Sequence, residues 1–203
     1  MRNRNVFVNC PFDNDYFPLF RPLLFSIIAL GYRPLLSETV DSSHSRIDQI
    51  KGLMKSSQYS IHDLSRVDSI VDVRKDQLPR MNMPFECGFD FGLKYSGVSK
   101  FATKRLLVLD RESHRYKTFL SDLSGSDIGI HHNSLEQMIK VVRNWFLHHT
   151  SVHLSYRQIL IAYHEFDSKL QELLIQEGLN PHNMFDIQFK ELILWMSNFL
   201  KKY

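Results

Sequence analysis

One carboxylate, Glu86, stands where it could act on a sugar. Residues 78–88, LPRMNMPFECG, predict a helix that begins at Met83 and Pro84, with Glu86 in its first turn. The positive end of the helix dipole favours an ionised carboxylate at that position. An ionised, positioned glutamate can attack an anomeric carbon, or stabilise the cation that develops on a sugar ring. The alternative is purely structural, because glutamate is favoured in the first turn of any helix.

Polar side chains also gather where predicted strands end, at the edge where an open parallel sheet binds its ligands. The segments are NCPFD at residues 9–13, ETVDS at 38–42, HDLSR at 62–66, and the stretch from Arg80 to Glu86. Simpler interpretations stand beside this one: Asp63 could only cap a turn, His62 could be structural, and surface arginines are normally solvated. These segments and the residues near them supply three kinds of group that a nucleotide site needs. Asp41 and Asp63 could accept hydrogen bonds from ribose hydroxyls, and Phe12 and Tyr16 could cover a base. Arg46, Arg66 and Arg80 could bind a phosphate, and the further candidate binding residues are Asn9, Pro11 and Asn82.

The elements that must position these residues alternate along the chain. Apolar runs predict strands at residues 5–9, 32–36, 58–62, 104–110 and 127–131, and helices are predicted at 16–30, 46–56, 83–94 and 134–149. This alternation predicts an α/β fold with helices on both faces of a parallel sheet. In helix 83–94, Gly88 and Gly92 share a face, which would let the helix approach another backbone closely.

The pattern changes after residue 150. Residues 156–177 and 185–202 predict two amphipathic helices separated by the breaker GLNP at 178–181. We therefore expect an α/β domain over residues 1–150 and a helical hairpin over residues 151–203. The hairpin either packs on the domain or binds a partner.

Composition narrows the function class. The 203 residues carry a net charge of +3 without a basic stripe, so direct nucleic-acid binding is not expected. Cys10 and Cys87 cannot form a disulfide framework, which predicts a reducing, cytoplasmic setting. The most apolar stretch, residues 22–30, is too short to span a membrane. No metal site is expected, because the histidines at 131–132, 148–149 and 153 are interpreted as solvated.

Three segments carry a family resemblance. VFVNCPF at residues 6–12, the strand ending in Asp63, and FECGF at residues 85–89 resemble the nucleoside 2-deoxyribosyltransferases and the TIR domains. The resemblance covers residues 5–149 and implies a flavodoxin-like fold. It also implies that Glu86 attacks or stabilises the anomeric carbon, that Asp63 binds the ribose or orients the leaving group, and that Asn9 and Phe12 line the pocket.

The sequence departs from both families just before the glutamate. RMNMP at residues 80–84 replaces the aspartate and the glycine–threonine pair of the deoxyribosyltransferases, and the tryptophan–cysteine signature of many TIR domains is absent. These departures favour an anionic ligand, a nucleotide or dinucleotide, over a free nucleoside.

The resulting hypothesis is an enzyme that cleaves the N-glycosidic bond of a nucleotide such as NAD, by hydrolysis or by transfer of the ribosyl group, and needs no cofactor. The resemblance further implies a homo-oligomer with a role in antiphage defence. Two alternatives stay open: a non-catalytic nucleotide sensor that signals through the C-terminal hairpin, and a TIR-type protein-interaction module.

Overall fold

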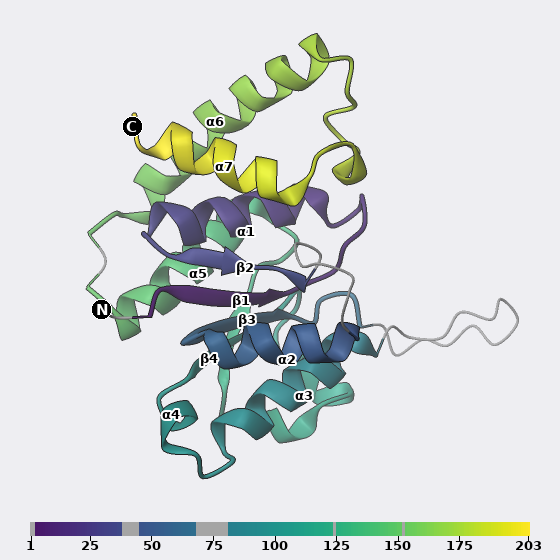
Figure 1. The fold of residues 1–203 in the computed structure, drawn as a ribbon, viewed down its shortest axis with the longest axis vertical. Helices are drawn as coiled ribbons and strands as arrows, with labels where there is room; N and C mark the ends of the chain where they lie inside the picture. Colours follow the sequence, from purple (N-terminus) through teal and green to yellow (C-terminus); the bar gives the residue numbers. More distant parts are fainter. Residues whose placement is uncertain (1–2, 38–44, 68–80, 124, 152) are drawn as a thin grey trace, which may run out of the picture. The chain divides into compact units, whose positions relative to one another are not determined.

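The strands of the chain form one five-stranded parallel sheet. In the computed structural model, which describes residues 3–37, 45–67, 81–123, 125–151 and 153–203, the strands lie in the order β2-β1-β3-β4-β5 (Figure 1). This order confirms the predicted α/β, flavodoxin-like class. The strands are β1 (Asn5–Asn9), β2 (Arg33–Leu35), β3 (Tyr59–Asp63), β4 (Arg105–Asp110) and β5 (Asp127–Ile130).

The predicted helices form, with ends that follow local capping signals. Ser45, Ser134 and Ser155 each accept a hydrogen bond from a backbone N–H in the first turn of α2, α5 and α6, respectively. Short helices at residues 99–102, 115–118 and 121–123 were not predicted, because single turns leave little periodicity in a sequence. The helix predicted over residues 185–202 begins instead at residue 189, after a separate short turn at 184–186. The helices are α1 (Phe17–Ala29), α2 (Arg46–Ser56), α3 (Asn82–Lys94), α4 (Ser99–Ala102), η3 (Arg115–Thr118), η4 (Ser121–Leu123), α5 (Leu135–His149), α6 (Tyr156–Gln176), η5 (Met184–Asp186) and α7 (Phe189–Leu200).

The chain divides into two compact units. The first comprises Met1–Pro11 and Leu35–His132, and the second comprises Phe12–Pro34 and Asn133–Tyr203. The predicted boundary lay after residue 150 instead. In the structure α1 and α5 group with the C-terminal helices α6 and α7.

In the first unit, α2 and α3 pack on the central strands. One apolar cluster joins Phe7 of β1 to Ile50 and Met54 of α2, with Phe89 of α3 against it. A second cluster, formed by Leu64, Val67, Met83, Cys87 and Val108, holds α3 against the ends of β3 and β4.

The expected role of the two helix glycines is wrong. Gly88 and Gly92 lie on the exposed side of α3, and an added Cβ at either would meet no atom within 4 Å. The buried side of α3 consists instead of Met83, Pro84, Glu86, Cys87 and Asp90.

In the second unit, α6 and α7 pack on α1 and α5. Phe25 of α1 lies against Tyr163 and Phe166 of α6 and Phe199 of α7, with ring centroids 5.4–6.2 Å apart. Arg21 of α1 forms an ion pair with Asp167 of α6 at 3.2 Å. The hairpin therefore contributes to a helical core, as the packing interpretation predicted.

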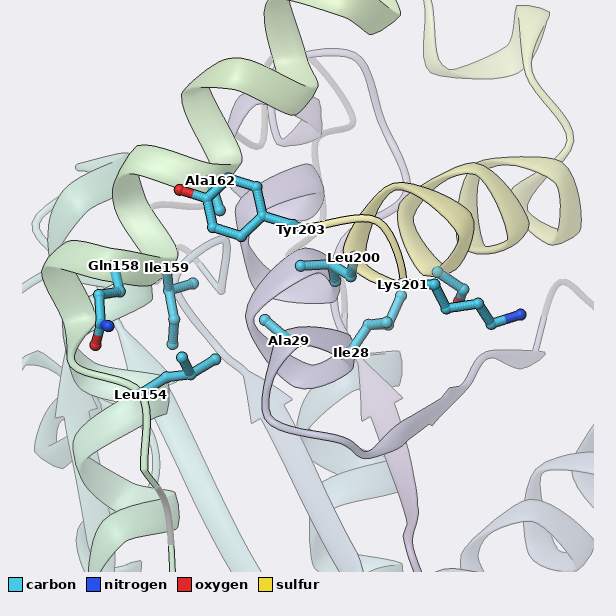
Figure 2. Close-up of a pocket in the computed structure, with 10 residues that line it drawn as sticks. Ile28, Ala29, Leu154, Gln158, Ile159, Ala162, Leu200, Lys201 and Tyr203 are labelled. Carbon is cyan, nitrogen blue, oxygen red and sulfur yellow. The ribbon is translucent and has the colours of Figure 1, made fainter.

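A cavity of about 640 Å³ lies among α1, α6 and α7 (Figure 2). The cavity is lined by Ile28, Ala29, Leu154, Gln158, Ile159, Ala162, Ser197, Leu200, Lys201 and Tyr203.

Among the residues that the structure describes, no helix is long and apolar enough to cross a bilayer.

Candidate functional site

Strand order locates the candidate site within the first unit. In an open parallel sheet, ligands bind beyond the carboxyl ends of the strands, where the chain reverses its direction of winding. For the order β2-β1-β3-β4-β5 that point lies between β1 and β3. Asn9 and His62 are register partners at this point, and Asp63 follows His62 at the end of β3. The structure thus places Asn9 and Asp63, two of the predicted site residues, at the ends of neighbouring strands.

Asn9 links the end of β1 to the beginning of α3. Its Nδ2 donates to the carbonyl of Met83 at 3.0 Å and lies 3.1 Å from Nδ1 of His62. A carbonyl can only accept, so the amide nitrogen, and not the amide oxygen, must face Met83. Nδ1 of His62 is then the acceptor of the second N–H, and the hydrogen of the neutral imidazole is on Nε2.

The imidazole of His62 continues this chain of contacts into the interior. Its Nε2 lies 3.2 Å from Oδ2 of Asp90 on α3, and both side chains are fully buried. Lys104 lies 3.1 Å from Oδ1 of Asp90 and also contacts the carbonyls of Met54 and Ser57. Burial by itself would raise the pKa of Asp90, but the hydrogen bond to His62 and the positive charge of Lys104 hold this pKa below its usual value.

Glu86 lies on the buried side of α3, with 8 % of its surface exposed. The helix begins at Asn82, so Glu86 is its fifth residue, and the prediction of a first-turn position is wrong. The reason is that Pro84, tolerated anywhere in the first turn, stands third in the helix and not at its start. Glu86 lies three residues, roughly 4.5 Å of helix rise, beyond Met83.

Asp63 is fully buried and makes contacts within the protein. Its Oδ1 accepts a hydrogen bond from the backbone N–H of Ser65 at 2.8 Å, and its Oδ2 lies 3.3 Å from Nε2 of His131. His131 is also fully buried, so its interpretation as a solvated residue is wrong. Residue 131 directly follows β5, and its burial comes from that position at the sheet edge.

Asp110, at the end of β4, adds a second buried carboxyl group. Its Oδ1 accepts hydrogen bonds from the backbone N–H of Arg111 and from Nε of Arg115, at 2.7 and 2.8 Å. The Arg115 guanidinium also donates to the carbonyls of Leu64 and Val67, so it ties the loop after β3 to β4. Burial raises the pKa of Asp110, and the charge of Asp63 adds to the rise, against the opposing effect of Arg115.

Four further predicted residues belong to the first unit. Pro11 is buried, and Arg66 is half-buried in the loop after β3. Arg46 and Asn82 are exposed, each as the first residue of a helix.

The other predicted residues lie elsewhere. Phe12 and Tyr16 belong to the second unit, where Phe12 stacks on Phe189 with ring centroids 5.6 Å apart and Tyr16 is buried at the beginning of α1. Asp41 and Arg80 lie outside the described residues.

The arrangement concentrates buried polar groups at one sheet edge. Each lies at the end of a strand or directly beside that end, and each is at most 4 % exposed: Asn9, His62, Asp63, Asp110 and His131. Sequence reasoning missed Asp110 and His131 as members of this group, although each stands at the end of a predicted strand. Among the described residues there is no group of three or more histidines, cysteines and acidic residues that could hold a metal ion.

Comparisons with protein-family models, with curated proteins and with solved structures found no match to this chain.

Proposed function

We propose that this protein cleaves the N-glycosidic bond of a nucleotide, with NAD as the first candidate. The observation that carries the proposal is the place of Glu86. Its helix is anchored to the end of β1 through the bond from Asn9 to the Met83 carbonyl, and Glu86 is the buried acid one turn further on. A mostly dehydrated carboxylate interacts more strongly with a developing cation than a solvated one does.

The chemistry requires few groups. As the bond between C1′ and the base nitrogen breaks, its electron pair leaves with the base and positive charge develops on the ribose ring. Glu86 stabilises that charge or bonds to C1′. Water then adds to C1′ and gives up one proton, so the products are the free base and the ribose end of the nucleotide. A pyridinium base such as nicotinamide leaves as a neutral molecule and needs no proton from the protein.

The test compares two glutamates. Glu86→Gln keeps the shape of the side chain and removes its charge, whereas Glu172→Gln changes an exposed residue of α6. Purified wild type and both variants are incubated with NAD, NADP, ATP and deoxynucleosides, and products are separated by liquid chromatography with mass detection. We expect wild type and Glu172→Gln to release a free base and Glu86→Gln to release at least a hundredfold less. Equal product from all three proteins would refute the role of Glu86.

One observation favours a second candidate, a nucleotide sensor without turnover. Asp63, the other predicted catalytic carboxylate, is fully buried between the Ser65 N–H and His131. A carboxylate already held on both oxygens is poorly placed to handle a substrate. Saturable binding of a nucleotide by calorimetry, with no product after prolonged incubation, would support the sensor. The predicted homo-oligomer and the role in antiphage defence belong to either candidate.

A further inference from the structure

We propose that Asn9 selects ligands by accepting a hydrogen bond through its side-chain oxygen, so that the site prefers a nucleotide that presents a neutral N–H or O–H donor there. This inference rests on the proposed function in one respect, namely that a nucleotide binds at the carboxyl ends of β1 and β3. It does not depend on whether that nucleotide is cleaved.

The first step concerns the two hydrogens of the Asn9 amide. One is donated to the Met83 carbonyl and the other to Nδ1 of His62. Both N–H donors are therefore used within the protein. The amide oxygen accepts no hydrogen bond from any residue that the structure describes. Asn9 can therefore bind a ligand only by accepting a hydrogen bond through this oxygen.

The second step concerns why the side-chain amide of Asn9 cannot rotate to exchange its nitrogen and oxygen. A reversed amide would put its oxygen 3.0 Å from the Met83 carbonyl oxygen, where neither atom has a hydrogen to share. His62 adds a second constraint, because Asp90 accepts from Nε2 and keeps the hydrogen there, which leaves Nδ1 as an acceptor. Lys104 in turn fixes the Asp90 carboxylate. The orientation of Asn9 is thus set by fully buried groups.

The third step turns orientation into selectivity. Asn9 is only 4 % exposed, so a bound ligand would remove what water remains at its oxygen. A ligand with a donor replaces that water, whereas a ligand with another acceptor leaves two oxygens facing each other. Sites built to hydrogen-bond a ligand group discriminate strongly against analogues that lack it. The carboxamide of nicotinamide, the amino group of adenine and the ribose hydroxyls are the donors that a nucleotide can supply.

The experiment measures binding in the Glu86→Gln background, so that turnover does not consume the ligand. Three ligand pairs separate the three sources of the donor. NAD against 3-acetylpyridine adenine dinucleotide removes the carboxamide N–H, NAD against nicotinamide hypoxanthine dinucleotide removes the adenine amino group, and ATP against 2′-deoxy-ATP removes a ribose hydroxyl. Dissociation constants are measured by calorimetry.

We expect the dissociation constants of the two ligands in one pair to differ by at least tenfold. This ratio should fall below about twofold when Asn9→Leu is added to the protein. Asn9→Ala serves as the second variant if the leucine variant does not fold. The inference is overturned if no pair differs with Asn9 intact, or if the difference survives both substitutions. Discrimination without product release by wild type would uphold the inference and refute the glycosidase. Failure of every nucleotide to bind would refute both.

The part of His62 is tested separately. His62→Gln keeps an acceptor for Asn9 and a donor for Asp90, whereas His62→Leu provides neither. We expect the glutamine variant to retain the discrimination and the leucine variant to lose most of it. A loss of affinity that is equal for both members of the pair, in both variants, would show that His62 only supports the fold.

Discussion

Oδ2 of Asp63 lies 3.3 Å from Nε2 of His131, and neither side chain is exposed to solvent. The two residues end or follow strands that are separated by β4, so their contact crosses the carboxyl edge of the sheet. A buried carboxylate beside a buried imidazole is stabilised only while both partners are present.

The first prediction concerns this pair. We expect Asp63→Asn and His131→Asn each to destabilise the fold by about 1–3 kcal/mol, because each leaves a buried polar partner without its counterpart. The double variant should lose less than the sum of the two, with a coupling of about 0.5–3 kcal/mol. The coupling is obtained from the free energies of unfolding in urea of wild type, the two single variants and the double variant. Additive losses would mean that the two groups do not interact.

The second prediction concerns Asp90. Asp90→Asn leaves the buried Lys104 ammonium without its counter-charge, and we expect a loss of about 3–5 kcal/mol at neutral pH. Asp48→Asn, which alters an exposed ion pair with Lys51 at 3.5 Å, should change stability by no more than about 1 kcal/mol.

The pH dependence of Asp90 has a definite sign. Its pKa in the folded protein lies below the ordinary value of 3.8, so the stability it contributes is present above that value and is lost as the pH falls through the folded-state pKa. The free energies of unfolding of wild type and Asp90→Asn, measured in urea, should therefore become more similar as the pH falls below about 4. If the difference in free energy of unfolding between the two proteins stays constant or increases down to pH 2, the lowered pKa of Asp90 is contradicted.

The third prediction concerns Arg115. Its planar guanidinium bonds Asp110 and the carbonyls of Leu64 and Val67 at once, and a lysine ammonium cannot match that geometry. We expect Arg115→Lys to destabilise the fold by about 2 kcal/mol. Arg111→Lys is the control, because Arg111 pairs with the exposed Glu112 at 3.5 Å. Equal thermal unfolding temperatures for the two variants would show that the shape of the guanidinium is unimportant.

The fourth prediction concerns the thiols. Burial, with a smaller effect of the Asp90 charge, raises the pKa of Cys87 to about 12. At neutral pH almost no thiolate is present there, and Cys10 is likewise buried. We expect neither cysteine to react with a disulfide reagent such as DTNB in the native protein, and both to react in urea. Rapid reaction of one thiol under native conditions would contradict the burial of that residue.

The sequence predicts the elements well where their signals are local. Helix α2 was predicted at residues 46–56 and begins and ends there, because Ser45 caps it and Ile50 and Met54 repeat at helical spacing. The parallel sheet follows from the alternation of strands with helices. The beginning of α3 was misplaced by one residue, which was enough to move Glu86 from the first turn to the second.

The polar interior was harder to predict, because it depends on partners that are distant in sequence. Lys104 is 1 % exposed, and nothing local distinguishes it from a solvated lysine at the start of a strand. Its burial requires Asp90 and the carbonyls of Met54 and Ser57. The same reason explains why His131 was expected to be solvated: its partner, Asp63, comes from another strand.

The fifth prediction concerns the backbone that leaves this edge of the sheet. His132 is exposed and has a φ of +50°, in the left-handed region that costs a side-chain-bearing residue about 1–2 kcal/mol. Glycine reaches this region without that cost, although its flexible unfolded state reduces the gain. His132→Gly should therefore be more stable than His132→Ala by about 1 kcal/mol, and because both variants lose the imidazole, the difference isolates the backbone. Urea unfolding of the two variants measures it. An alanine variant as stable as the glycine variant would mean that residue 132 does not hold the left-handed conformation in solution.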